Sequence, residues 1–380
     1  MITFEGVTKR YPDGTVAVDD LTLEIPTGAI TVLVGPSGCG KTTTLRMINR
    51  MIEPSDGRIR IDDGDIMAID PPTLRRGIGY VIQQAGLFPH RTILGNISTV
   101  PQLLGWPKEK ARARATELME LVGLPAPLAE RYPHQLSGGQ QQRVGVARAL
   151  AADPPVLLMD EPFSAVDPIV RTNLQDELLR LQAELNKTIV FVTHDIDEAI
   201  KVGDRIAVMR TGRVAQYATP SELLAAPADP FVESFLGADR GIRRLGFFAA
   251  KDLTLHTETV LPADTMASVA RSKAEAAGEP WVLVIDADRN PVGWADATSL
   301  TGDAPVGASA TVPYGHVFHV QTDSLRAALD AAVLSPAGRA VGVDAAGQVV
   351  GIVTQGELGA ALGEAGDTAG AAEEAVGGPS

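Results

Sequence analysis

The stretch Gly35-Pro36-Ser37-Gly38-Cys39-Gly40-Lys41-Thr42 follows the apolar run Ile30–Val34 and precedes a helix-compatible segment that begins at Thr43. Glycines allow backbone N–H groups to turn inward around an anion, and the N-terminus of the following helix adds partial positive charge. In this pattern Lys41 reaches the β- and γ-phosphates of a nucleotide, while the Thr42 hydroxyl ligates Mg²⁺. The stretch, with Thr43 beside it, predicts a triphosphate-binding loop. The alternative is a glycine-rich turn between a strand and a helix, in which the lysine would stand by accident.

Composition and charge bound the number of domains and the class of partner. The chain has 380 residues, 45% of them hydrophobic, and at about 150 residues per domain it is long enough for two or three domains. Residues 246–380 contain 17 acidic and 6 basic residues, a net charge of −11 out of −14 for the whole chain. So acidic a segment does not bind nucleic acid through phosphate contacts, and we expect no nucleic-acid partner.

Three features of the sequence bear on its location. The single cysteine, Cys39, cannot form an internal disulfide, which fits a reducing cytosol. The first residues lack the basic and apolar regions of a signal peptide. Because no run of about 18 apolar residues is free of charge, the sequence predicts no membrane span.

The order of elements predicts an α/β core with additions. The first 30 residues alternate short β-type runs with Pro-Asp-Gly and Pro-Thr-Gly turns, which predict a small antiparallel layer that brings Tyr11 ahead of the phosphate-binding loop. Residues 79–82 are a candidate buried strand that ends in Gln83 and Gln84. Residues 89–150 show helical spacing with a charged face, and they predict a helical insertion into the core.

The insertion ends in Leu136-Ser137-Gly138-Gly139-Gln140, here called the signature segment. Ser137 is a good N-cap for the helix that follows, and two glycines at a helix start permit close approach to an anion. The alternative is an ordinary serine-capped helix.

Two apolar strands end in polar side chains. Asp160 and Glu161 follow Val156–Met159, and His194 follows Thr188–Thr193. Beside a phosphate site, Asp160 can hold Mg²⁺ through its water shell and Glu161 can polarise the attacking water. We expect His194 to contact the γ-phosphate or that water, although a histidine after a strand is often structural. The alternative for the two carboxylates is a polar strand end that caps the next helix.

Over residues 1–240 these motifs resemble, in order and spacing, the ATPase subunit of an ABC transporter. The likeness rests on the phosphate-binding loop, the glutamine after a strand, the signature segment, the Asp-Glu strand end, Ser164-Ala165-Val166-Asp167 and the strand-ending histidine. It implies an α/β fold of the P-loop NTPase type, with an antiparallel β layer and a helical insertion. It also implies ATP and Mg²⁺ as cofactors, with Thr42, Gln83 and Asp160 as the metal ligands.

The same resemblance implies a role for individual residues. Tyr11 would stack on adenine. Gln83, or less favourably its neighbour Gln84, would sense Mg²⁺ and contact the permease. Glu161 would be the general base, and His194 would be the switch histidine.

The resemblance also implies an assembly. Ser137, Gly138, Gly139 and Gln140 would close on the nucleotide held by the opposite subunit, and Asp167 would belong to the nucleotide site. Because the chain contains a single cassette, the working unit is expected to be a homodimer that closes over two ATP molecules.

The second part of the chain contains an internal repeat. The runs Trp281–Asp286 and Pro291–Gly293 recur as Arg339–Asp344 and Val349–Gly351, 58 residues later. Two hairpin-and-helix units of this size, over residues 256–363, resemble a tandem pair of CBS domains, an α+β structure. A linker is expected at 241–255 and a disordered acidic tail at 364–380. Coincidental α+β similarity is the alternative.

Such pairs often bind adenosine ligands through a Ser or Thr and, three residues later, an Asp. The second copy keeps part of this pattern in Thr354 and Glu357, which are the candidate ligand residues. The first copy has Asp296 and Ser299 at these places, where a carboxylate would repel phosphate. We therefore do not expect a conventional two-site nucleotide sensor.

An ABC ATPase followed by a CBS pair resembles the ATPase subunit of importers that take up glycine betaine, carnitine, choline or proline. Residues 47–54 and 79–90 are also similar to that branch. The resemblance implies a peripheral protein on the cytoplasmic face of the cell membrane, with a separate permease and, indirectly, an extracytoplasmic substrate-binding protein. The acidic CBS pair would regulate activity, with ionic strength as a candidate signal.

Two other functions stay open. One is an importer ATPase for a different solute. The other is a soluble, non-transport ATPase that uses the CBS pair as an energy sensor. The acidity of the second part would, in the simplest case, only keep it in solution.

Overall fold

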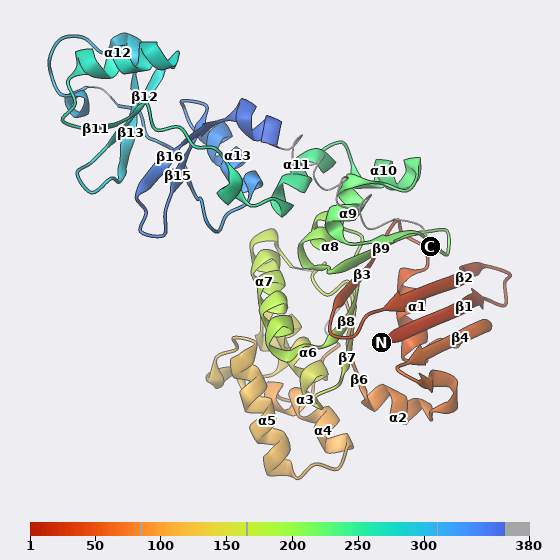
Figure 1. Cartoon of the computed structure of the whole chain (residues 1–380). Helices are drawn as coiled ribbons and strands as arrows, with labels where there is room; N and C mark the ends of the chain where they lie inside the picture. Colours follow the sequence, from red (N-terminus) through yellow and green to blue (C-terminus); the bar gives the residue numbers. More distant parts are fainter. Residues whose placement is uncertain (84–85, 165, 310, 362–380) are drawn as a thin grey trace. The chain divides into compact units, whose positions relative to one another are not determined.

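The computed structural model describes residues 1–83, 86–164, 166–309 and 311–361 (Figure 1). The chain divides into two compact units, Met1–Gly237 and Ala238–Ser380. Gln84, Ala165 and the predicted acidic tail lie outside the described residues. Within the described ranges, no helix has both the length and the apolar character needed to cross a membrane.

A six-stranded sheet forms the centre of the first unit. All neighbouring strands are parallel except the edge strand β10, which pairs antiparallel with β9. The three inner strands β3, β8 and β7 are buried along their whole length, because packed elements cover both faces of the sheet. In spatial order the strands are β10 (Arg213–Ala218), β9 (Arg205–Arg210), β3 (Ile30–Val34), β8 (Thr188–Val192), β7 (Val156–Asp160) and β6 (Ile78–Val81).

One face of this sheet is covered by α1 (Lys41–Ile48) and by a second, antiparallel sheet. Ile2 and Phe4 of the antiparallel sheet share a core with Leu45 and Met47 of the helix. This is the antiparallel layer that the turn-rich beginning of the chain predicts. Its strands, in spatial order, are β2 (Val16–Ile25), β1 (Ile2–Arg10), β4 (Asp56–Ile61) and β5 (Gly64–Asp65).

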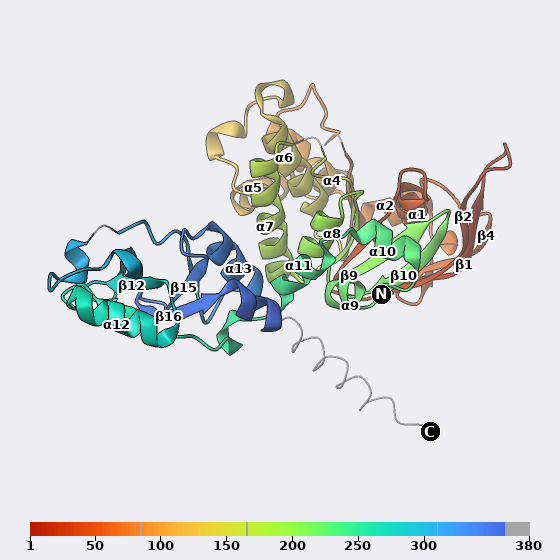
Figure 2. The same ribbon diagram turned by 90° about the horizontal axis from the view of Figure 1, so that it is seen from above.

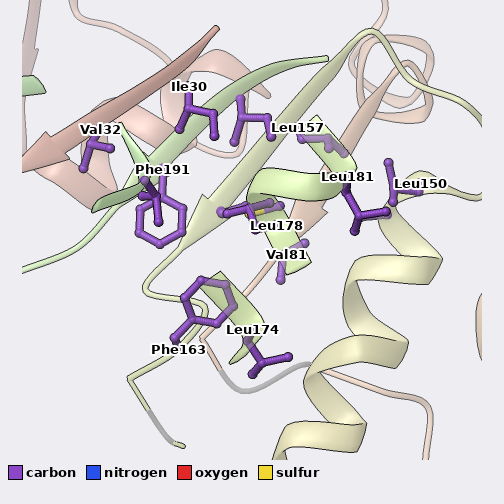
Figure 3. Close-up of a cluster of buried hydrophobic side chains, with 14 of the residues drawn as sticks. Ile30, Val32, Val81, Leu150, Leu157, Phe163, Leu174, Leu178, Leu181 and Phe191 are labelled. Atoms are coloured by element: carbon purple, nitrogen blue, oxygen red, sulfur yellow. The ribbon is translucent and has the colours of Figure 1, made fainter. Parts of the chain in front are cut away.

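Helices cover the opposite face. They are α6 (Gly138–Leu150), α7 (Pro168–Leu185), α8 (Ile196–Val202), α9 (Pro220–Ala225) and α10 (Pro230–Leu236). Figure 3 shows Leu174 and Leu178 of α7 beside Phe163 and Phe191, whose ring centres are 5.7 Å apart. This core fixes α7 and α8 against the strands that end in the polar residues of the site.

The predicted helical insertion is confirmed. Between residues 89 and 150, all of which are described, every regular element is a helix or a 3₁₀ turn. Figures 1 and 2 both show α4, α5 and α6 grouped together. The elements are α3 (Ile93–Ile97), α4 (Thr99–Leu103), α5 (Lys108–Leu121), turns at Ala126–Leu128 and Pro133–Gln135, and α6.

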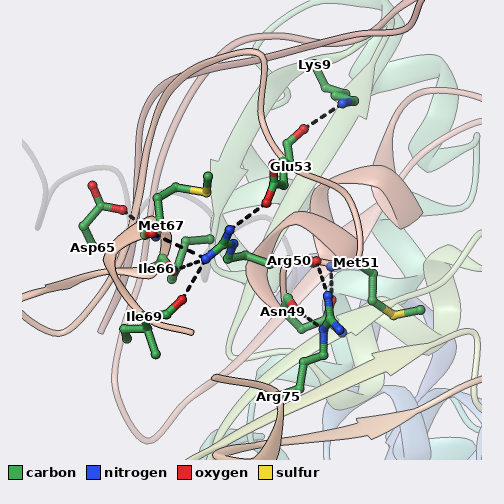
Figure 4. A network of polar contacts seen from close by, with 10 residues as sticks. All are labelled: Lys9, Asn49, Arg50, Met51, Glu53, Asp65, Ile66, Met67, Ile69 and Arg75. Atoms are coloured by element: carbon green, nitrogen blue, oxygen red, sulfur yellow. Dashed lines mark hydrogen bonds and ion pairs between the residues drawn. The ribbon is translucent and has the colours of Figure 1, made fainter. Parts of the chain in front are cut away.

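A polar network holds the chain that follows α1 (Figure 4). Arg50, at a φ of 52°, donates to the carbonyl oxygens of Ile66 (3.3 Å) and Ile69 (2.7 Å) and pairs with Glu53 at 2.6 Å. Arg75 of α2 (Pro71–Arg76) donates to the Arg50 carbonyl oxygen at 2.6 Å. The network thereby anchors the end of the helix that begins at the phosphate-binding loop.

The second unit consists of two copies of one motif. Each copy has a three-stranded sheet in which the first pair of strands is parallel and the second antiparallel. Trp281 lies opposite Asp296, and Arg339 lies opposite Thr354, so the pairing recurs 58 residues later on both strands. The first copy contains β11 (Val260–Pro262), α12 (Ala267–Ala277), β12 (Trp281–Ile285) and β13 (Pro291–Asp296); the second contains β14 (Val317–His319), α13 (Leu325–Leu334), β15 (Arg339–Val343) and β16 (Val349–Thr354).

The boundary between the units differs from the predicted one. The second unit begins at Ala238, and residues 241–255, expected to be a linker, pack into it. Leu245 is 3% exposed and Ala250 is fully buried, in the same core as Phe318. The segment carries few apolar residues and follows a charged helix, α11 (Arg240–Arg244), so its packing has no periodic signal in the sequence.

Candidate active site

The phosphate-binding loop joins β3 to α1, and close backbone approaches require two of its glycines. Gly35 has a φ of 150°, and a Cβ there would lie 2.3 Å from the Met209 carbonyl oxygen. Gly40 has a φ of 105°, and a Cβ there would lie 2.4 Å from the Ala17 carbonyl oxygen. A larger side chain at either position would displace backbone.

Lys41 begins α1 and is 6% exposed. Its ammonium group donates to the carbonyl oxygens of Gly35 at 2.8 Å and Pro36 at 3.0 Å, and it lies 3.7 Å from the Sγ atom of the buried Cys39. Phosphate oxygens could replace these carbonyl oxygens as charged acceptors. A cleft of about 230 Å³ opens here, lined by Ala17, Ser37, Gly38, Gly40, Lys41, Thr42, Thr43 and Glu161.

The predicted metal ligands Thr42 and Asp160 meet across the sheet. The Thr42 hydroxyl donates to a carboxylate oxygen of Asp160 at 2.9 Å, and the Asp160 side chain is only 9% exposed. Arg46 lies 3.8 Å from the other carboxylate oxygen, and the Tyr80 hydroxyl donates to it at 3.5 Å. Burial, together with the Asp160 charge, raises the pKa of Tyr80. A hydroxyl and a carboxylate oxygen this close form a donor set that suits Mg²⁺.

Glu161 is the point on which three predicted residues converge. Its φ of 46° is unusual for a residue other than glycine, and its N–H donates to the Val192 carbonyl oxygen at 2.9 Å. The Gln83 amide donates to one carboxylate oxygen of Glu161 at 3.2 Å, and the His194 Nδ1 atom lies 3.3 Å from the other. The same Gln83 nitrogen also donates to the Ser164 hydroxyl at 3.2 Å. The glutamine, the carboxylate and the histidine therefore form one cluster at the edge of the cleft.

Other predicted residues are not among those that line the cleft. Tyr11 is half-buried, and the Lys9 ammonium lies 5.5 Å from its ring centre. Asp167 is exposed and caps α7, because its carboxylate accepts from the Val170 N–H at 3.1 Å. The signature segment caps α6 through Ser137 and its bonds with Gln140, one from each backbone N–H. In this single chain, the described part of the structure does not bring the signature segment to the phosphate-binding loop.

Four residues of the site were not predicted. Ala17 forms part of the wall of the cleft, and the Ser164 hydroxyl contacts Gln83. Arg46 stands four residues after Thr42, so its place on the same face of α1 could have been found from helical spacing. Tyr80 had no such signal, because its contact with Asp160 depends on the pairing of β6 with β7.

The second unit holds a pocket of about 310 Å³. Glu357 accepts from the Thr354 N–H at 2.9 Å and hydroxyl at 2.7 Å, and the His256 ring lies 2.5 Å from its other oxygen. Burial raises the pKa of Glu357, but the bonds from Thr354 and the contact with His256 outweigh burial and leave it below its usual value. Burial lowers the pKa of Arg339, which is paired with Glu279. The lining residues are His256, Glu258, Thr259, Ala277, Glu279, Arg339, Ile352, Val353, Thr354 and Glu357.

Asp296 and Ser299, the equivalent positions of the first copy, do not line this pocket. The Asp296 carboxylate accepts from the N–H and hydroxyl of Thr298 at 2.8 and 2.7 Å. The Ser299 hydroxyl donates to the Asp296 carbonyl oxygen at 2.8 Å. Both side chains thus make local bonds that cap a turn.

Comparison with known proteins places these features in a family. The ABC transporter family model matches residues 18–164. The chain is 47% identical over 361 residues to the carnitine transport ATP-binding protein OpuCA of Listeria monocytogenes, covering 94% of this chain and 91% of that protein. It is 50% identical over 320 residues to the osmoprotectant import ATP-binding protein OsmV of Salmonella typhimurium, covering 83% of this chain and 84% of that protein.

Solved structures agree with the fold of the first unit. The dimeric, post-hydrolysis structure of the ATP-binding cassette MJ0796 with ADP and Pi is 37% identical, with a TM-score of 0.53, over 58% of this chain and 99% of that chain. The cbiO1 subunit of an ABC transporter from Clostridium perfringens is 31% identical, with a TM-score of 0.56, over 63% of this chain and 96% of that chain. The predicted ABC ATPase fold is confirmed. The chain belongs to the family of ABC transporter ATP-binding proteins, in the branch that contains the osmoprotectant import subunits.

Proposed function

We propose that this chain hydrolyses ATP to drive import of a quaternary ammonium compound or related osmoprotectant through a separate membrane permease. The observation that carries the proposal is the convergence of Gln83, Glu161 and His194 beside the cleft formed by the phosphate-binding loop. The substrate class rests on relatives named for transport of carnitine and for osmoprotectant import.

The geometry supports a division of labour in hydrolysis. The loop N–H groups and Lys41 bind the β- and γ-phosphates, and the contact of Thr42 with Asp160 marks the place of the metal ligands. Mg²⁺, when bound, supplies charge that neutralises the phosphates. Glu161 accepts a proton from the attacking water, and His194 holds the carboxylate and contacts the γ-phosphate. Gln83, through its carbonyl oxygen, is the third candidate metal ligand.

We further propose that two copies complete the site. The signature segment is not among the residues that line the cleft of its own chain, and its capped helix offers backbone N–H groups to an anion on a facing molecule. The related cassette MJ0796 forms a dimer in its ADP-bound structure. Asp167, exposed at the start of α7, would then lie at the interface between the two copies.

Family membership places the complex at the cytoplasmic face of the cell membrane. The permease would contact the first unit near Gln83, and an extracytoplasmic binding protein would deliver the solute to the permease. The second unit would act as a tandem CBS regulator. Its pocket, with Thr354 and Glu357 on one wall, is the candidate place for a small regulatory molecule.

The test is uptake by vesicles that contain the chain and the permease with which it co-purifies. We expect ATP-dependent uptake of radiolabelled carnitine, choline or glycine betaine. Glu161→Gln should still bind ATP but lower hydrolysis and uptake by about 100-fold or more, because it removes the proton acceptor. The variant should also accumulate as an ATP-loaded dimer, measured by light scattering.

Other outcomes would contradict this proposal in separable ways. Near-normal hydrolysis by Glu161→Gln would remove the general-base role. Uptake of an unrelated solute alone would replace the substrate class. ATPase activity without any co-purifying permease would favour a non-transport enzyme, and an ATP-loaded monomer would remove the shared site.

A further inference from the structure

His194 has little to hold its side chain in place. The side chain is 59% exposed, and among the described residues its recorded polar contact is Glu161 at 3.3 Å. The position of the imidazole therefore depends on the backbone on either side of residue 194. That backbone is held by Thr193, which is 2% exposed, and by the start of α8.

The start of α8 is tied to this backbone by short polar contacts. The Asp195 N–H donates to the Thr193 hydroxyl oxygen at 3.0 Å, and the Asp195 carboxylate accepts from the N–H groups of Asp197 and Glu198 at 2.9 and 3.3 Å. The side chain of Glu198 is hydrogen-bonded to that of Thr193. His194 thus stands between two residues, Thr193 and Asp195, that are both bonded to the first turn of the helix.

Glu198 is a buried carboxyl group for which the proposed hydrolysis has no use. It is 7% exposed, and it accepts a hydrogen bond from the amide of Gln175 on α7 at 3.1 Å. Gln175 is itself 6% exposed. Burying two polar side chains costs free energy unless they are bonded to each other, so this pair fixes one relative position of α7 and α8.

A second contact extends the link along α7. Arg171, one turn before Gln175, lies 3.7 Å from the Asp195 carboxylate and donates to the Val166 carbonyl oxygen at 3.3 Å. Val166 precedes Asp167, the cap of α7. The same helix face therefore contacts both the loop that begins α7 and the residues beside His194.

We infer that Gln175 and Glu198 are positioning residues for His194: their buried hydrogen bond fixes the start of α8 against α7 and so holds the imidazole beside Glu161. The inference rests on the proposed ATPase activity. It requires the geometry of the hydrogen bond rather than the charge of the carboxyl group. A residue with an amide at position 198 should therefore work.

The test compares kcat and KM for ATP in the full-length protein. Gln175→Leu and Glu198→Leu should each lower kcat by about 10- to 100-fold with little change in KM, because a displaced histidine affects the chemical step rather than ATP binding. The conservative variant Glu198→Gln should keep kcat within about 2-fold of the wild type, since its amide oxygen can accept the same bond. Circular dichroism and thermal unfolding measure the folded fraction of each variant.

Gln182→Leu is the matched control. Gln182 lies on the same helix and donates to the Gly28 carbonyl oxygen at 2.7 Å, so its loss also removes a hydrogen bond from α7. We expect this variant to lose stability while its kcat per folded molecule stays at the wild-type value.

Three results would overturn the inference. They are a wild-type kcat in Gln175→Leu and Glu198→Leu, an equal loss of kcat in Gln182→Leu, and a loss in Glu198→Gln as large as that in Glu198→Leu. A wild-type protein without ATPase activity would instead overturn the proposed function, so the two failures are distinguishable.

Discussion

At the scale of single residues, Glu198 links stability to pH. Burial raises the pKa of its carboxyl above the ordinary value of 4.5, and Asp195 adds to this; bonds from Thr193 and Gln175 and the charge of Arg171 act against it. Between 4.5 and the raised pKa the folded protein binds more protons than the unfolded chain, so the contribution of Glu198 to the free energy of unfolding falls as pH rises. We expect Glu198→Gln, which does not titrate, to gain stability relative to the wild type between about pH 5 and about pH 8. Urea unfolding at several pH values measures the difference, and a difference independent of pH would show that the carboxyl is already ionised when folded.

At the scale of elements, Asn96 of α3 organises the loop that precedes it. Its side chain is fully buried, accepts from the Phe88 N–H at 2.7 Å and donates to the carbonyl oxygens of Phe88, Arg91 and Thr92 at 3.0 to 3.2 Å. Asn96→Ala would leave several backbone groups without partners, and we expect the free energy of unfolding to fall by about 1–3 kcal/mol. Because this loop lies close in sequence to Gln83, the variant should also retain less permease on co-purification. Asn173→Ala, at an exposed position of α7, is the control and should change neither quantity; equal stability of the two variants would contradict the role of Asn96.

At the scale of the whole molecule, the negative charge is concentrated after residue 245. Like charges repel across a Debye length of about 8–10 Å, and added salt screens this repulsion. If charge sets the response of transport to ionic strength, the double variant Asp252→Lys and Asp288→Lys should shift half-maximal activation of uptake to lower salt, since both side chains are exposed. Glu24→Lys with Asp63→Lys, the same charge change at exposed positions of the first unit, should not shift it. Identical salt curves for both pairs would leave the acidity with a role in solubility alone.

The sequence allowed some parts of this structure to be predicted and not others, for physical reasons. Lys41, Asp160 and His194 could be placed because each directly follows a buried strand or a glycine-rich turn, where the local pattern determines the position of the side chain. The partnership of Gln175 with Glu198 could not, because it depends on how two helices pack. For the same reason, nothing in the composition of residues 241–255 indicated that they would join the core of the second unit.

Cys39 is the only thiol in the 380 residues, and it is 4% exposed within the phosphate-binding loop. A cysteine introduced at an exposed position, such as Asn173, would therefore react with a maleimide probe far faster than the native one. Spin or fluorescent labels could then report distances between two copies during the ATP cycle, in a protein that retains its natural loop.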